Sequence, residues 1–135
     1  MTTRTIASVA ATAFGGLALF QLALALGAPL GDAAWGGAQE TLTPGLRVGS
    51  AVSVLFYMLA IGVILRRAGM NVPWVASGVA RIGAWALVVL LLLSALGNLA
   101  SESSWERYLM APLALVLAAM CFVVARGAAH HPEPA

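Results

Sequence analysis

The sequence contains four long apolar runs, and no Asp, Glu, Lys, Arg or His lies inside the body of any of them. Three extend over Ile6 to Gly27, Val48 to Leu65 and Ile82 to Ala100, and the fourth ends at about Arg126. A helix of about 20 apolar residues can cross the hydrocarbon core of a bilayer. With 61% hydrophobic and 9% charged residues, the chain is too apolar for a water-soluble domain, which is about 45 to 50% apolar. The sequence therefore predicts an all-α fold, a four-span transmembrane helical bundle.

The chain is expected to form a single domain, residues 1–127, followed by a short tail. The predicted spans lie at about 6–27, 46–67, 78–100 and 105–126. The tail, 128–135, contains two prolines and His130-His131, and it is predicted to be disordered and cytoplasmic. Ala23-Leu24-Ala25 resembles a signal-peptide cleavage site. Because the first run is longer than a signal core of about 7 to 15 residues, we expect an uncleaved first span.

Local signals predict where the helices begin and end. Thr43-Pro44 is typical of an N-cap residue followed by proline at the first helical position, and Gly69 is expected to stop the same helix after Arg66-Arg67. Ser103-Ser104-Trp105-Glu106 matches the capping box, in which Ser103 accepts a free helix N–H and Glu106 reaches back to the N-cap N–H. The third connection is therefore expected to be tight, and Pro112 is expected to kink the helix that follows.

The first connection, Ala28 to Leu42, is the longest and is rich in Gly and Ala. Its composition predicts either a short interfacial helix capped by Asp32 or a segment that folds back over the mouth of the bundle. Trp35 is expected at the membrane interface, where tryptophan side chains are common.

The arginines are distributed unevenly between the two sides of the predicted membrane. Only Arg47 and Arg107 lie on one side, together with four of the five acidic residues. The other side carries Arg4, Arg66, Arg67, Arg81 and Arg126. Because cytoplasmic loops are enriched in Lys and Arg, the predicted topology is N-in/C-in. The long first connection and the short third connection would then face outward.

Polar side chains gather in the outer halves of the predicted helices. Ser94 and Asn98 share one face of the third span, because residues four apart lie on the same side of a helix. The same rule places Ser50, Ser53 and Tyr57 on one face of the second span. The predicted ligand-binding residues are Gln21, Ser50, Tyr57, Ser94, Asn98, Glu106 and Arg107. The first five would form a polar cavity open to the outside, rimmed by Arg47, Glu106, Arg107, Asp32 and Trp35. The simpler interpretation is that the uncharged groups hydrogen-bond between helices.

Several function classes are excluded by what the sequence lacks. A net charge of +2 on scattered arginines provides no basic surface for nucleic acid. A single cysteine, Cys121, excludes an internal disulfide, paired-thiol redox chemistry and a cysteine metal cluster. No phosphate-binding loop, HExxH motif or nucleophile–base set is present, and no span contains the ionisable group that proton-coupled transporters normally carry. We therefore expect no enzymatic activity, no cofactor and no bound metal.

Three stretches are distinctive: QLALALGAPLGDAAWGG from Gln21, LRVGSAVS from Leu46, and GNLASESSWERYLMAPLALVLAAMCFVVA from Gly97. Together they resemble a family of small four-helix integral membrane proteins from actinobacteria and other bacteria. The resemblance covers nearly the whole chain except the tail. It implies four spans in a bacterial cytoplasmic (inner) membrane, and it carries over no activity and no functional residue.

These observations lead to two functional hypotheses. The first is a non-enzymatic small membrane protein that binds a lipid, a small ligand or a membrane partner through the outer polar residues. The second is an oligomeric small-solute transporter or channel. The expected partner is the lipid bilayer. A homo-oligomer or larger membrane assembly stays open, because the small-residue faces Ala7-Ala11-Gly15 and Ala114-Ala118 suit close packing within or between chains.

Overall fold

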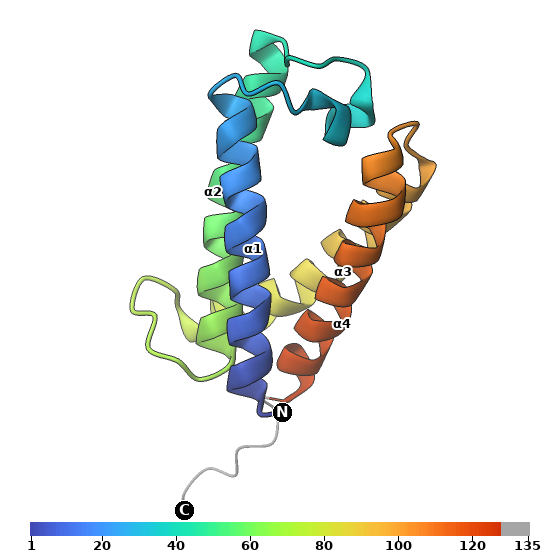
Figure 1. Ribbon diagram of the computed structural model, residues 1–135. Helices are drawn as coiled ribbons and strands as arrows, with labels where there is room; N and C mark the ends of the chain where they lie inside the picture. The colour runs from blue at the N-terminus through green and yellow to red at the C-terminus, as the bar shows by residue number, and fades with distance from the viewer. Residues whose placement is uncertain (128–135) are drawn as a thin grey trace, which may run out of the picture.

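The computed structural model describes residues 1–127, which form four long helices and no strand (Figure 1). The helices are α1 (Thr3–Ala25), α2 (Pro44–Arg67), α3 (Ser77–Ala100) and α4 (Ala111–Gly127), with a π-helical turn, η3 (Glu106–Met110), directly before α4. Each of them, α4 taken together with η3, is long and apolar enough to cross a membrane. The predicted all-α, four-span bundle is confirmed. The predicted disordered tail, 128–135, lies outside the described residues.

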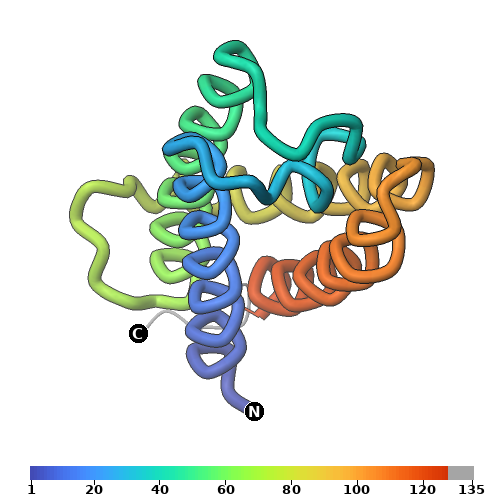
Figure 2. Tube along the Cα trace, turned by 45° about the horizontal axis from the view of Figure 1, so that its top comes forward, coloured from blue at the N-terminus to red at the C-terminus, as the bar shows by residue number. Residues whose placement is uncertain are grey.

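The helices form two antiparallel pairs, α1 with α2 and α3 with α4 (Figure 1). The pairs cross and lie closest where α1 begins and α4 ends, here termed the terminal end (Figure 2). There a Cβ added to Gly127 would lie 2.9 Å from Thr3 Oγ1. The pairs diverge toward the opposite end, here termed the connection end, which carries the first and third connections at 26–43 and 101–105.

The main hydrophobic core occupies the terminal half of the bundle, where all four helices meet the second connection, residues 68–76. Its largest fully buried side chains include Phe14, Ile64 and Leu117. Alanines on α1 and α4 let the helix backbones approach closely, as small residues do in membrane bundles. The buried alanines of these two helices are Ala7, Ala10, Ala18, Ala111, Ala114, Ala118 and Ala125. The packed half of the bundle is therefore nearly pure hydrocarbon.

Two of the predicted helix signals act as expected. Thr43 is the N-cap of α2, its Oγ1 accepts the Leu46 N–H at 3.4 Å, and Pro44 is the first helical residue. At the other end of α2, Gly69 adopts φ +80°, a left-handed conformation that glycine tolerates without steric cost.

Arginine side chains bind carbonyl groups that the helix ends leave without a partner. Arg67 Nη2 donates to the Ala125 carbonyl at 2.6 Å, which joins the end of α2 to the last turn of α4. Arg47 Nε donates to the Ala25 carbonyl at 2.9 Å, which joins the start of α2 to the end of α1. Cations are favourable at helix C-termini because the last carbonyls carry partial negative charge.

The fourth span departs from α geometry just before Pro112, in the π-helical turn Glu106–Met110. The Ala111 N–H bonds to the Glu106 carbonyl, five residues earlier. Pro112 has no N–H to donate, and its ring would press on the carbonyl of the preceding turn. A wider π turn relieves that clash, so the irregularity predicted at Pro112 lies one turn earlier than expected.

Candidate functional site: a polar cavity at the connection end

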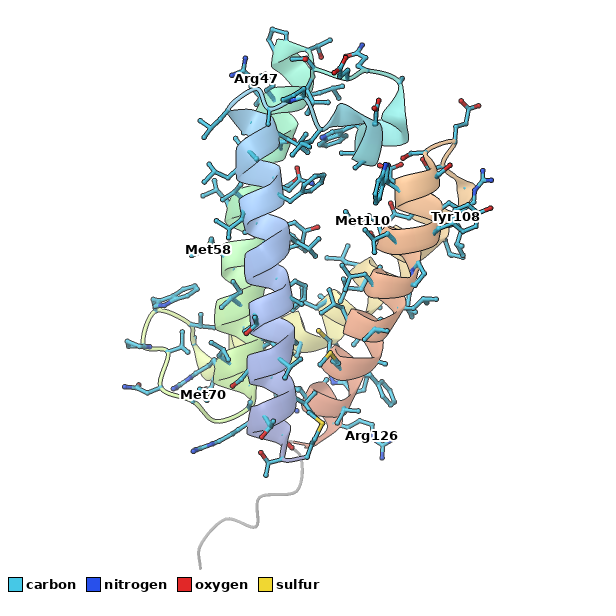
Figure 3. All side chains as sticks on the ribbon, in the orientation of Figure 1. Arg47, Met58, Met70, Tyr108, Met110 and Arg126 are labelled. Atoms are coloured by element: carbon cyan, nitrogen blue, oxygen red, sulfur yellow. The ribbon has the colours of Figure 1, made fainter. Side chains whose placement is uncertain are left out.

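A cavity of about 280 Å³ lies between the two helix pairs at the connection end, and it is partly open to the surroundings. Side chains from all four helices and from the first connection line it. Its polar lining side chains, beside the ring of Trp35, are Gln21, Ser53, Tyr57, Ser94, Asn98 and Glu106. Met110 also lines it, and in Figure 3 this side chain lies on the side of the fourth helix that faces α1, whereas Tyr108 lies on the outer side.

Side chains of the hydrophobic core form the wall of the cavity that faces the terminal end. Leu91 and Leu117 both line the cavity and belong to the core. The ring of Tyr57 lies 6.0 Å from that of Phe14, which is fully buried. The cavity is therefore closed toward the terminal end by packed side chains.

The first connection forms the roof. It consists of two short 3-10 turns, η1 (Gly31–Ala33) and η2 (Trp35–Gly37), folded across the mouth between the helix pairs (Figure 2). Ala34 packs with Leu24 and Leu42 in a small separate hydrophobic cluster. Of the two predicted conformations, the segment folded over the bundle mouth is therefore the correct one. The alternative, an interfacial helix capped by Asp32, is wrong, because neither short turn has a side-chain cap.

A left-handed turn in the roof directs the Gly36 N–H toward Glu106 of the fourth span. Trp35, Gly36 and Gly37 have φ values of 51°, 82° and 74°. Gly37 is needed for space as well, because an added Cβ would lie 2.9 Å from both the Asp32 carbonyl oxygen and Ser103 Cβ. The strained backbone at Trp35 is thus held in place by close packing on either side.

Trp35 anchors the roof to α2. Its indole Nε1 donates to Ser50 Oγ at 3.0 Å, and Ser50 is fully buried. The ring lies against Gly49, where an added Cβ would approach the ring carbons to 3.0 Å. The structure thus gives Trp35 a packing role that the interface prediction did not include, because its ring packs on α2 and lines the cavity.

Glu106 ties the roof to the fourth helix. The side chain is 9% exposed, and both carboxylate oxygens accept the Gly36 N–H at 3.2 Å. Oε2 also accepts the Ser101 hydroxyl. A second tie is made by Ser103, whose hydroxyl donates to the Asp32 carbonyl. The carboxylate thus holds neutral donors from two separate connections.

Only half of the predicted capping box forms. Ser103 Oγ accepts the Glu106 N–H at 3.4 Å, as expected. The reciprocal bond is absent, because the Ser103 N–H donates to Ser101 Oγ instead and the Glu106 carboxylate points to Gly36. The capping-box motif predicted that the Glu106 carboxylate would bind the start of its own helix, but it binds the Gly36 N–H of the roof instead.

The uncharged polar groups of the cavity are not joined across helices within residues 1–127. Gln21 Oε1 is buried there without a hydrogen-bond partner. Asn98 Nδ2 donates to Ser94 Oγ at 3.3 Å within α3. Ser53 Oγ donates to the Gly49 carbonyl at 3.0 Å within α2. A buried polar group usually has a partner, so the Gln21 amide is the one group of the cavity lining whose oxygen departs from that rule among the described residues.

The structure brings together most of the predicted ligand-binding residues. Five line the cavity, namely Gln21, Tyr57, Ser94, Asn98 and Glu106. The other two lie outside it. Ser50 is buried beneath Trp35, and Arg107 is exposed, with Nη2 donating to the Ser101 carbonyl at 2.7 Å.

Sequence reasoning left Ser53 and Met110 out of the predicted site and placed Trp35 at its rim, whereas all three line the cavity. Ser53 was detectable, because it shares a helical face with Ser50 and Tyr57. The exact positions of Trp35 and Met110 were not, since they depend on the folding of the first connection and on the π turn. The backbone N–H of Gly36 has no sequence signal of any kind.

Among residues 1–127, no group of three or more His, Cys, Asp or Glu side chains is placed to hold a metal ion. The cavity instead offers one carboxylate, two amides, hydroxyl groups and aromatic rings. Comparison with known proteins adds no assignment, because no family model, no curated protein and no solved structure matches the chain.

Proposed function

We propose that this chain is a non-enzymatic integral membrane protein that binds a lipid headgroup or a small amphipathic ligand in the cavity at the connection end. The observation that carries the proposal is Gln21 Oε1, an acceptor buried in the cavity wall without a partner among the described residues. Leaving such a group unsatisfied costs about 1 to 3 kcal/mol. Because the Gln21 side chain lines the cavity, a turn of its amide would let a bound molecule donate to this oxygen and remove that cost.

The depth and shape of the cavity support an amphipathic ligand. Gln21 and Ser94 lie about 6 and 9 Å below the ends of their helices, at 1.5 Å per residue, which is close to the headgroup region. Deeper in, Leu91 and Leu117 present hydrocarbon. A volume of about 280 Å³ lies just below the range of about 300 to 1,000 Å³ typical of drug-sized ligands, so a headgroup or small molecule fits best.

The absence of catalytic chemistry is part of the proposal. The hydroxyl groups that line the cavity belong to Ser53, Tyr57 and Ser94, and within the described part of the chain no histidine, lysine or second carboxylate lines it with them. An enzyme would need a nucleophile with a base in hydrogen-bond reach. Binding without reaction is therefore the function that these side chains suit.

The second hypothesis, an oligomeric transporter or channel, is less well supported. A solute that entered the cavity would meet the core beneath Tyr57, where Phe14 and Leu117 are almost completely buried. A path would need to open between chains or by a large movement of the helix pairs. Solute flux through proteoliposomes that falls when Asn98 is replaced by leucine would favour this hypothesis.

We further propose that both termini face the cytoplasm of a bacterium and that the cavity opens outward. The uneven distribution of arginines supports this topology, and the resemblance to small bacterial membrane proteins supports the compartment. The variants Gln39→Cys and Asn71→Cys, each in a Cys121→Ala background, test the topology. A membrane-impermeant maleimide added to spheroplasts should label the first variant alone, and the reverse pattern would overturn the topology.

The binding function is tested by native mass spectrometry of the full chain released from mild detergent. A lipid or small molecule should remain attached to the wild-type protein and should be lost from Gln21→Leu and Asn98→Leu. Gln39→Leu serves as the matched control, because Gln39 is exposed on the first connection and does not line the cavity. Equal retention by all four proteins, or no retention by any, would argue against a ligand in this cavity.

A further inference from the structure

We propose that the cavity recognises a primary ammonium group, carried either by a lipid headgroup or by a free amphipathic amine. This inference rests on the proposed binding function and names the chemistry of the ligand. Its basis is that Glu106 and Gln21 line the same partly open cavity, and that the amide oxygen of Gln21 has no partner among residues 1–127.

The charge of the cavity favours a cation. Among residues 1–127, Glu106 is the only charged residue that lines it. The arginines nearest in sequence or at the same end are engaged elsewhere, since Arg107 donates to the Ser101 carbonyl and Arg47 to the Ala25 carbonyl. A buried carboxylate without a cationic partner is costly, and a ligand cation beside it would lower that cost. A phosphate or carboxylate ligand would instead meet a like charge.

The hydrogen-bonding groups favour a donor. A carboxylate has about four acceptor positions, and within residues 1–127 Glu106 accepts from the Gly36 N–H and the Ser101 hydroxyl. Gln21 Oε1 accepts from none of these residues. The amide nitrogen of Asn98 already donates to Ser94, which leaves its oxygen as a further acceptor. A primary ammonium carries three donors and no acceptor, so it complements these oxygens.

Aromatic side chains complete the match. Phe20, Trp35 and Tyr57 line the same cavity. The face of an aromatic ring attracts a cation, and the attraction is about 2 kcal/mol or more where water is excluded. The rings also suit the apolar part of an amphipathic amine. An anionic ligand would gain nothing from the ring faces.

The probe for the experiment is 2-phenylethylammonium, added to the full chain in phosphatidylcholine nanodiscs. The matched probes are 2-phenylethanol, 3-phenylpropionate and the trimethylammonium analogue, which change the charge or remove the donors. Binding is followed by the fluorescence of Trp35 in a chain with Trp74, Trp85 and Trp105 replaced by phenylalanine, because Trp35 lines the cavity. The primary ammonium should bind about tenfold or more tightly than each of the other three.

Variants separate recognition of the ammonium from general binding. Glu106→Gln keeps an oxygen for the Gly36 N–H and should reduce the preference for the ammonium over the alcohol to about twofold or less. Glu102→Gln, at an exposed position of the third connection just before η3, should leave the preference unchanged. Gln21→Leu leaves the Glu106 contacts with the roof intact, so it tests the proposal if Glu106→Gln fails to fold. It should weaken the primary ammonium more than the trimethyl analogue.

The outcomes distinguish this inference from the proposed function. Equal binding of the ammonium and the alcohol, or tighter binding of the propionate, would overturn the inference while the binding function stands. Binding of none of the probes, together with no retained lipid, would overturn both. In nanodiscs of equal phosphatidylethanolamine and phosphatidylglycerol, retention of phosphatidylethanolamine would identify a lipid headgroup as the source of the ammonium. Binding of the free amine without that retention would identify a soluble amine, and preferential retention of phosphatidylglycerol would refute the inference.

Discussion

Replacement of Gln21 by leucine is predicted to stabilise the ligand-free protein. The Oε1 atom is buried and has no partner among residues 1–127, so folding deprives this acceptor of hydrogen bonds without replacing them. The cost of such a group is about 1 to 3 kcal/mol. Leucine is of similar size, contains no polar atom and would lie beside Leu17 and Phe20 at the cavity wall. We therefore expect the free energy of unfolding to rise by about 1 to 3 kcal/mol.

The sign of the change distinguishes this reasoning from the simpler interpretation of the polar residues. If Gln21 hydrogen-bonded between helices, its removal would lower the free energy of unfolding by about 0.6 kcal/mol on average and by at most about 1.7. Equilibrium unfolding in mixed micelles, followed by circular dichroism after extraction of bound lipid, measures the difference. Gln39→Leu, on the exposed first connection, should change stability by less than about 0.5 kcal/mol. A destabilised Gln21→Leu protein would refute the assignment of a free acceptor in the cavity.

Three further predictions concern the roof and the core. Trp35→Phe keeps an aromatic ring but removes the indole N–H and leaves the fully buried Ser50 hydroxyl without its donor, so it should destabilise the protein by about 1 to 3 kcal/mol, whereas adding Ser50→Ala should recover part of the loss. A double-mutant cycle measured by unfolding should give a coupling energy above about 0.5 kcal/mol, and strict additivity would contradict the bond. Gly49→Ala should displace the Trp35 ring and shift its fluorescence, because the new Cβ would lie 3.0 Å from ring carbons; Gly45→Ala, with no atom within 4 Å of the new Cβ, should not, and equal spectra for the two variants would contradict the packing. Cys121, which is fully buried in the core, should resist N-ethylmaleimide in nanodiscs and react after unfolding in SDS, so rapid labelling of the native protein would indicate that the terminal half is not closed.

The four spans were predictable because the bilayer imposes their length and composition. A helix that crosses hydrocarbon needs about 20 apolar residues, and because these residues are consecutive, each run can be recognised directly in the sequence. Thr43-Pro44 and Gly69 were predictable for a similar reason, because a helix end depends on a few neighbouring residues. The polar face of α3 followed from the spacing of Ser94 and Asn98 alone.

Predictions that required distant partners were less successful. Glu106 was assigned to its own helix N-terminus, but its carboxylate accepts from Gly36, a residue of the first connection. Asp32 was a candidate cap, yet its carbonyl accepts from Ser103 and its segment forms a roof. In both cases the observed conformation depends on a hydrogen bond to a residue that lies about 70 positions away in the chain.

The sequence by itself determined that the helices suit a lipid bilayer, how many of them can span it, and which of their residues are polar. These properties depend on composition and on spacing within one helix. Only the tertiary structure decided what those polar residues do. The helix pairs diverge at the connection end, so Gln21 and Asn98 face a cavity and not each other. The crossing of the pairs arises from packing among all four helices, and no single run of residues encodes it.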